Sequence, residues 1–142
     1  VLAIRPGGRG EIIDANEPIP PDSPLQIVWR SKRNVPKKPS LLFQGGLLYA
    51  IDENGVATCW EAGTGRTVWN ERVGGNYSAS PVAAEGRLYA FSEEGKTTVL
   101  ATGPEFRKLA ENSLDDGFMA SPAIAGKSLF LRTKSALYRI GR

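Results

Sequence analysis

The feature that most constrains this sequence is an internal repeat of about 40 residues. Three serines stand 40 and 41 residues apart, and an aromatic residue follows each of them nine positions later (Ser40 and Tyr49, Ser80 and Tyr89, Ser121 and Phe130). Apolar runs and Gly-containing turns recur at matching positions. Four short strands joined by tight turns in about 40 residues are typical of a β-propeller blade, which must stack on its neighbours because it cannot bury both faces alone.

We therefore predict an all-β chain made of β-propeller blades, each a four-stranded antiparallel sheet. Gly (16) and Pro (10) recur too often for sustained helices. Asn54-Gly55 is the strongest hairpin signal, because both residues tolerate positive φ. For the best-defined repeat we expect strands A to D, in chain order, near residues 41–44, 47–51, 56–61 and 66–73.

The repeat predicts one partial propeller of about three and a quarter blades, too few to close a ring. Residues 1–38 end a first blade and contain a long proline-rich loop at 9–24. Residues 39–79 and 80–120 are each one blade, and residues 121–142 begin a last blade. The chain enters a blade midway and does not begin with Met, so we expect a piece of a longer protein. Open blade edges predict self-association, completion by the rest of the parent propeller, or aggregation.

One segment carries a family resemblance. Ala62, Thr64, Gly65 and Trp69 form the pattern Ala-x-Thr-Gly-x-x-x-Trp, which resembles the tryptophan-docking motif of PQQ-like (pyrroloquinoline-quinone-type) propeller repeats. Trp29 stands 40 residues before Trp69 and resembles the same family. The resemblance implies that each tryptophan packs on the next blade, with a stacking platform for a ligand as the alternative. It also implies a C-terminal fragment of a longer propeller.

Two details qualify the resemblance. The repeat after Trp69 has Leu109 where the next tryptophan would stand. WD40 repeats match less well because their Gly-His signature needs a histidine and the chain has none, and kelch repeats are nearer 50 residues long.

Composition narrows the classes of function. Without histidine the chain has no Ser-His-Asp or Cys-His site and lacks the commonest zinc ligand. Its single cysteine, Cys59, forms no disulfide framework and is expected to be a buried, inert thiol. The net charge of +3 is too small to favour nucleic acid. No apolar run reaches the roughly 18 residues of a membrane span.

The loops that join strand D of one repeat to strand A of the next are the candidate binding surface. The first contains five positive charges in nine residues, at 30–38. If the repeat holds, it shares one face with the loops at 73–79 and 113–120. The alternatives are a solvated loop for the basic run and aromatic rings that plug the blades. Possible partner-binding residues are Arg33, Lys37, Lys38, Asn76, Tyr77, Asp116 and Phe118.

We predict a non-catalytic binding or scaffolding module that meets a protein partner through this face. In the PQQ-like family, propellers without cofactor residues act as assembly factors, sensor domains and interaction platforms. The alternative is part of a PQQ- and calcium-dependent quinoprotein dehydrogenase whose active site lies in blades outside this chain. We assign no catalytic, cofactor-binding or metal residue here, and interpret the carboxylates of the tight turns as solvated. Sugar binding is a third possibility, and the resemblance implies an exported or periplasmic bacterial setting.

Overall fold

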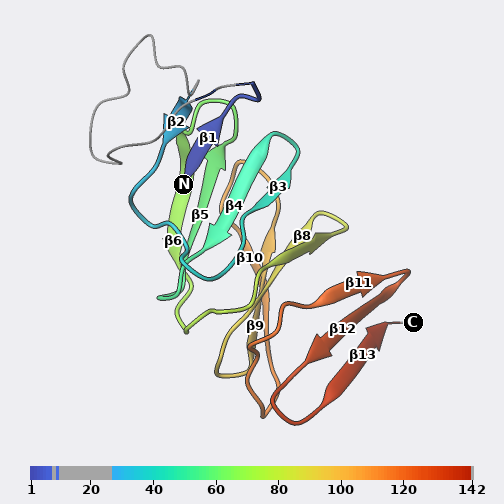
Figure 1. Cartoon of the computed structure of the whole chain (residues 1–142). Coiled ribbons are helices and arrows are strands. Elements are labelled where there is room, and N and C mark those ends of the chain that lie inside the picture. The colour runs from blue at the N-terminus through green and yellow to red at the C-terminus, as the bar shows by residue number, and fades with distance from the viewer. Residues whose placement is uncertain (8, 10–26, 142) are drawn as a thin grey trace.

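The computed structural model describes residues 1–7, 9 and 27–141. These residues form thirteen strands and no helix, in four antiparallel sheets that follow one another in an open row (Figure 1). The predicted all-β fold of incomplete propeller blades is therefore confirmed. The loop predicted at 9–24 lies, apart from residue 9, outside the described residues.

Each sheet is built from strands that are consecutive in the chain. The first contains β1 (Leu2–Ile4) and β2 (Ile27–Arg30), the second β3 (Leu42–Gln44), β4 (Leu47–Ile51), β5 (Val56–Glu61) and β6 (Thr67–Arg72), the third β7 (Val82–Ala84), β8 (Arg87–Phe91), β9 (Lys96–Ala101) and β10 (Lys108–Ser113), and the fourth β11 (Ala123–Ala125), β12 (Ser128–Arg132) and β13 (Leu137–Gly141). The four strands predicted for the second sheet are all found within one residue of their expected ends.

The core lies between neighbouring sheets. Tyr49, Cys59 and Trp69 stand opposite one another on β4, β5 and β6, so their side chains project from the same face of the second sheet. Leu88 and Leu100 of the third sheet pack against them. Burial raises the pKa of the Cys59 thiol to about 11, so the thiol stays protonated near neutral pH.

Tryptophan side chains join one sheet to the next. The Trp29 Nε1 donates a 2.7 Å hydrogen bond to the Ala62 carbonyl, and a Cβ added to Gly65 would lie only 2.5 Å from the Trp29 ring. The turn after strand C of the second sheet thus forms the seat for the Trp29 ring of the first sheet. Position 65 must be glycine because any side chain there would collide with that ring. Gly65 also has a φ of +72°, which favours glycine on its own account.

The same arrangement recurs between the second and third sheets. Trp69 Nε1 donates to the Gly103 carbonyl at 3.2 Å, while the Gly103 amide donates to the Tyr49 hydroxyl at 2.7 Å. The Trp69 ring also contacts the rings of Tyr49 and Phe106, at centroid distances of 5.9 and 5.4 Å. One aromatic column therefore crosses the interface.

The third sheet lacks a docking tryptophan. In the second sheet Trp69 stands opposite Cys59, whereas in the third Ala110 stands opposite Val99. The equivalent position lies one residue beyond Leu109, because the turn before β10 is one residue longer: Glu61 donates to the Arg66 carbonyl in the second sheet, whereas Ala101 donates to the Arg107 carbonyl in the third. The third and fourth sheets are joined instead by a cluster that contains Phe91, Phe118 and Leu131.

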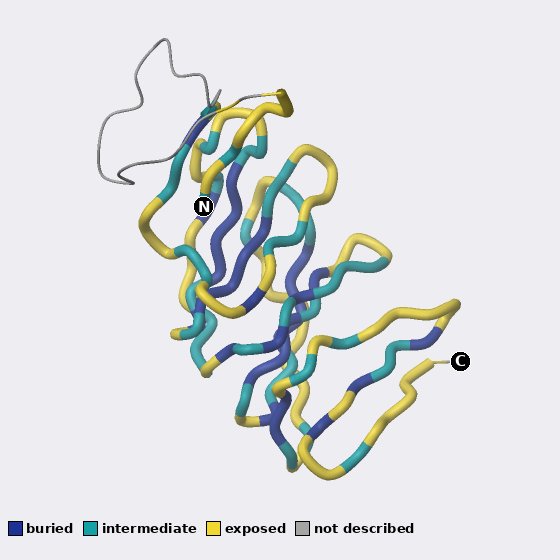
Figure 2. The backbone as a smooth tube through the Cα atoms, in the orientation of Figure 1, coloured by how far each residue is buried: buried dark blue, intermediate teal, exposed yellow. Residues whose placement is uncertain are grey.

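Burial is concentrated in the middle two sheets, and the fourth sheet is largely exposed (Figure 2). All five residues of β13 are exposed, with Leu137 at 72% and Ile140 at 51%. Among the described strands β13 pairs only with β12, so its other edge is open.

Trp69→Ala should lower the free energy of unfolding of the chain by about 3–5 kcal/mol, because it removes a buried ring from the interface. Trp69→Phe should cost less, since it keeps an aromatic ring and loses the hydrogen bond to Gly103. Urea unfolding followed by circular dichroism measures both. A loss below about 1 kcal/mol for the alanine variant would contradict a docking role.

The open edge of β13 should make the isolated chain associate with itself, because exposed apolar strands pair with other strands. Analytical ultracentrifugation should show species larger than a monomer. Replacing Leu137 and Ile140 with lysine places charges on that edge and should shift the chain towards monomer. A wild-type chain that sediments only as a monomer would sink this prediction.

Candidate binding face

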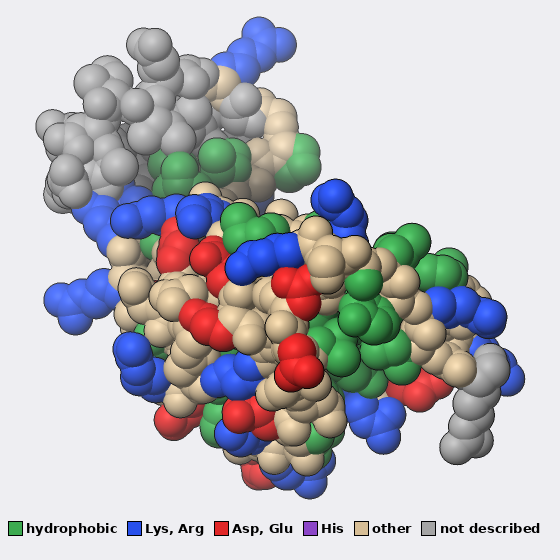
Figure 3. Space-filling view, turned by 90° about the horizontal axis from the view of Figure 1, so that it is seen from below, with side chains coloured by type: hydrophobic (Ala, Val, Ile, Leu, Met, Phe, Trp, Pro, Cys, Tyr) green, Lys and Arg blue, Asp and Glu red, His purple; other side chains and the backbone are tan. Residues whose placement is uncertain are grey.

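The loops from strand D to strand A and the turns from strand B to strand C emerge at the same end of the sheets. At this end Val73 donates its amide hydrogen to the Gly55 carbonyl, and Leu114 donates to Gly95. The tight turns that receive the tryptophans lie at the opposite end, where Ala62 donates to the Gly46 carbonyl. Figure 3 looks onto the first of these ends and shows Lys and Arg side chains interspersed with Asp and Glu.

The repeated serines are contact points between neighbouring sheets. The Ser40 amide donates to the Ser80 hydroxyl at 2.9 Å, and the Ser80 amide donates to the Ser121 hydroxyl at 2.9 Å. The residues that revealed the repeat in the sequence therefore occupy equivalent places in the structure. This ladder aligns the three D–A loops, so position 37 of the first corresponds to 77 of the second and 118 of the third.

The turn carboxylates hold these loops in place. Glu53 accepts the Lys37 amide at 2.8 Å, and Glu93 accepts the Ser78 hydroxyl. Glu94 accepts the Asn76 side chain at 2.6 Å and its backbone amide at 3.2 Å. These acids are therefore more than solvated turn residues, because their hydrogen-bond partners come from the adjacent D–A loop, which the sequence of a single turn does not reveal.

The Asp116 carboxylate likewise holds a neighbouring segment in place, in this case the turn between β12 and β13. Its carboxylate accepts hydrogen bonds of 2.7 Å from both the amide and the hydroxyl of Ser135. Hydrogen bonds from the Ser135 and Thr133 side chains and from backbone amides lower the pKa of Asp116 to about 2. Asp116 is thus engaged within the fold rather than presented to a partner.

Glu94 also has a low pKa. Its partial burial acts to raise the pKa, but hydrogen bonds from Ser92 and from the side chain and backbone of Asn76 outweigh that effect and lower it to about 2. Asn76 itself is exposed on the face. Its backbone and side-chain amides both donate to the Glu94 carboxylate, so Asn76 is engaged within the fold.

The two aromatic residues predicted for the binding face are buried, so that part of the prediction is wrong. Tyr77 is 0% exposed and its hydroxyl shares a 3.2 Å hydrogen bond with the Thr98 hydroxyl. Phe118 is 1% exposed and meets the Phe91 ring edge-on, with 5.2 Å between centroids. Burying each ring between two sheets removes its apolar surface from water, which is more favourable than leaving the ring exposed. The alternative interpretation, rings that plug the blades, describes both.

The basic residues of the first loop do remain on the surface. Arg33, Lys37 and Lys38 are exposed. Lys38 Nζ donates to the Ser78 hydroxyl at 3.2 Å and lies 3.9 Å from the Glu93 carboxylate. Met119, which the sequence analysis did not single out, is 55% exposed beside the buried Phe118. Its position next to an aromatic residue gave no separate signal.

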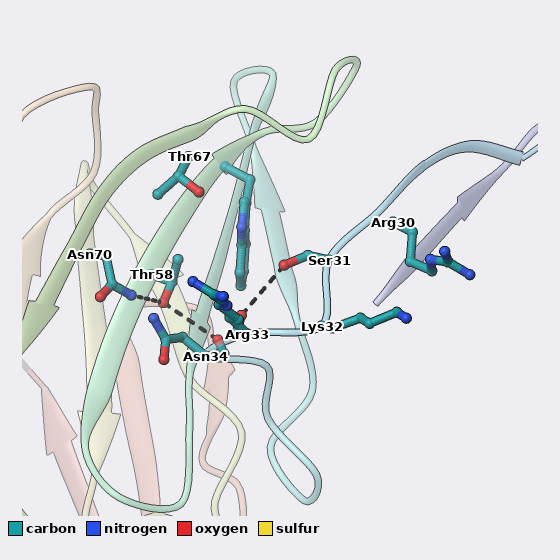
Figure 4. Close-up of a pocket in the computed structure, with 9 residues that line it drawn as sticks. Arg30, Ser31, Lys32, Arg33, Asn34, Thr58, Thr67 and Asn70 are labelled. Carbon is teal, nitrogen blue, oxygen red and sulfur yellow. Dashed lines mark hydrogen bonds between the residues drawn. The ribbon is translucent and has the colours of Figure 1, made fainter. Parts of the chain in front are cut away.

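Two grooves flank the basic loop. One has a volume of about 450 Å³ and lies between the loop and strands β5 and β6 (Figure 4). The other, of about 440 Å³, lies between the loop and the turn after β4. The described residues that line the first are Arg30, Ser31, Lys32, Arg33, Asn34, Thr58, Trp60, Thr67 and Asn70.

Neither a metal centre nor a membrane helix is found in the described part of the chain. Residues 1–7, 9 and 27–141 contain no group of three or more His, Cys, Asp or Glu side chains placed to hold a metal ion. No helix among them is long and apolar enough to cross a membrane.

A family model described as outer membrane protein assembly factor BamB matches residues 26–106, more than half of the chain. The chain belongs to this BamB family of PQQ-like propeller repeats. The match spans the first tryptophan dock and the second and third sheets up to the seat of Trp69. No curated protein matches the chain.

Solved structures with the same fold include BamB from Moraxella catarrhalis, with a TM-score of 0.66 and 19% identity over 83% of this chain and 38% of that one. The computationally designed Ika4 protein matches with a TM-score of 0.54 and 16% identity, over 71% of this chain and 64% of that one. A europium-containing methanol dehydrogenase matches with a TM-score of 0.51 and 13% identity, over 65% of this chain and 20% of that one. These identities establish the shared fold alone. The chain thus spans little more than a third of the length of BamB.

Acid should destabilise the chain through Glu94 and Asp116. Both pKa values are depressed, so the hydrogen bonds stabilise the fold above the ordinary carboxyl pKa of about 4 and are lost as pH falls towards about 2. Urea unfolding at a series of pH values should show this decline.

In Glu94→Gln the stability should be lower at neutral pH and should fall less steeply in acid. Glu105→Gln, a change at an exposed position in a turn at the other end of the sheets, should behave like the wild type. An acid profile of Glu94→Gln that parallels the wild type would contradict the assignment.

Proposed function

We propose that this chain is a binding or scaffolding segment of a PQQ-like propeller, and that it meets a protein partner through the face that carries the D–A loops. The observation that most strongly supports this proposal is the exposed basic loop around Arg33, Lys37 and Lys38, which lies between two grooves. Hydrogen bonds fix the adjoining loops of the same face. Charged side chains at the rim of a concave surface steer and orient a partner of opposite charge.

The rigidity of the face supports the same proposal. Glu53, Glu93 and Glu94 hold the backbone and side chains of the adjoining loops, so little conformational entropy is lost when a partner binds. The family description, an assembly factor of outer membrane proteins, accords with a protein-binding role and with an exported bacterial setting.

The proposal assigns no catalytic residue and no cofactor to this chain. PQQ and calcium belong only to the dehydrogenase alternative, whose site would lie in other blades of a parent propeller. The open β13 edge would be completed by such blades or by a second copy.

Site-specific photocrosslinking tests the proposal in the full-length protein in its own cells. Benzoylphenylalanine in place of Lys38, Asn76 or Met119 should give a discrete crosslinked protein. The same label in place of Gln44 or Glu85, at the other end of the sheets, is the matched control and should give none. Equal crosslinking from both ends, or none from the first, would count against a binding role for this face.

A further inference from the structure

The groove beside the basic loop coincides with a missing aromatic plug. Lys37, Tyr77 and Phe118 hold the same place in three successive D–A loops, 40 and 41 residues apart, as the serine ladder shows. Tyr77 and Phe118 are fully buried between sheets, whereas Lys37 is exposed. The gap between the first and second sheets therefore has no ring from this position.

The threonines locate the space that the ring would fill. Tyr77 contacts Thr98, which stands opposite Ala90 in the third sheet. Thr58 stands opposite Ala50 in the second sheet and is thus the equivalent of Thr98. Thr58 lines the 450 Å³ groove, where its hydroxyl donates to the Asn34 carbonyl at 3.5 Å, while Lys37 lines the second groove. The first groove therefore adjoins the place that Tyr77 fills one blade further along.

The groove is polar and cationic. Figure 4 shows Arg33 extending towards Thr58 and Asn70, while Arg30 and Lys32 extend to the other side of the connection. Asn70 donates to the Thr58 hydroxyl at 2.6 Å, which keeps this wall in place. None of the described residues that line the groove is acidic, and Arg33 makes no ion pair with a described residue.

We propose that this groove binds an aromatic side chain from an acidic segment of a protein partner. The ring takes the place beside Thr58 that Tyr77 takes beside Thr98, and carboxylates flanking it meet Arg33. Arginine frequently pairs with carboxylates through two parallel hydrogen bonds, and aromatic side chains in well-packed pockets are enriched among the residues that contribute most to binding at protein interfaces. The groove volume lies within the range of about 300–1,000 Å³ usual for ligand sites. The inference rests on the proposed function and names the partner's chemistry.

Three labelled nine-residue peptides test the chemistry by fluorescence polarisation with the full chain. The first has a central tyrosine flanked by aspartates and glutamates, the second has alanine for the tyrosine, and the third has asparagine and glutamine for the acids. The first should bind at least about tenfold more tightly than either of the others. Equal binding of all three would overturn the proposal.

Two variants test the place. Lys37→Tyr puts the ring of the neighbouring loops into the groove and should weaken binding of the first peptide at least about tenfold without lowering the unfolding midpoint. Lys127→Tyr makes the same change in the exposed turn between β11 and β12 and should bind like the wild type. If Lys37→Tyr fails to fold, Arg33→Gln gives a second readout, with an expected loss of similar size. Wild-type binding by a folded Lys37→Tyr or by Arg33→Gln would overturn the assignment.

A single-stranded oligothymidylate with the same number of charges as the first peptide separates a nucleic acid from a protein partner. It should bind more weakly than the peptide, and tighter binding would overturn the proposal. If crosslinks form from the D–A face but the first peptide does not bind, this inference fails and the proposed function stands. If the crosslinks are absent as well, both fail.

Discussion

A tryptophan ring seated on a backbone turn of the next blade is the contact on which the rest of this structure depends. Each sheet has two faces, and only a neighbour can cover them. Trp29 and Trp69 fix that neighbour in direction as well as distance, because each ring packs on a tight turn while its N–H donates to a carbonyl, that of Ala62 or of Gly103. Where Ala110 takes the tryptophan's place, the fourth sheet is held by Phe91 and Phe118.

Blade stacking also determines the binding face. Because the sheets are held in a common orientation, their D–A loops reach one end, and the turn acids of one repeat can accept hydrogen bonds from the adjoining loop. Asp116 with Ser135 and Glu94 with Asn76 are examples in which a polar turn residue organises its neighbour. Exposed cations are then left on the first loop, around Arg33, where the D–A loop contributes no aromatic residue to the gap between sheets.

Most strand positions could be predicted because the signals are local. Alternation, turn glycines and the serine spacing placed β4 and β5 to the residue. Spacing alone predicts the third tryptophan equivalent at Leu109, but the turn before β10 is one residue longer than the turn before β6, and the average repeat length does not reveal this. The aromatic residues of the D–A loops could be assigned to the same position but not to the surface or the interior. That choice depends on the width of the gap between two sheets.

The amino-acid sequence by itself determined the repeat length, the all-β class, the antiparallel pairing within blades and the family, because each depends on residues close together in the chain. Only the tertiary structure decided which loop residues reach solvent, which turn acids are engaged, and where a groove opens. These properties arise between blades, from side chains about 40 residues apart whose packing no local pattern records. Lys37 and Tyr77 occupy equivalent places in the repeat, yet one is exposed beside a groove and the other is buried in a core.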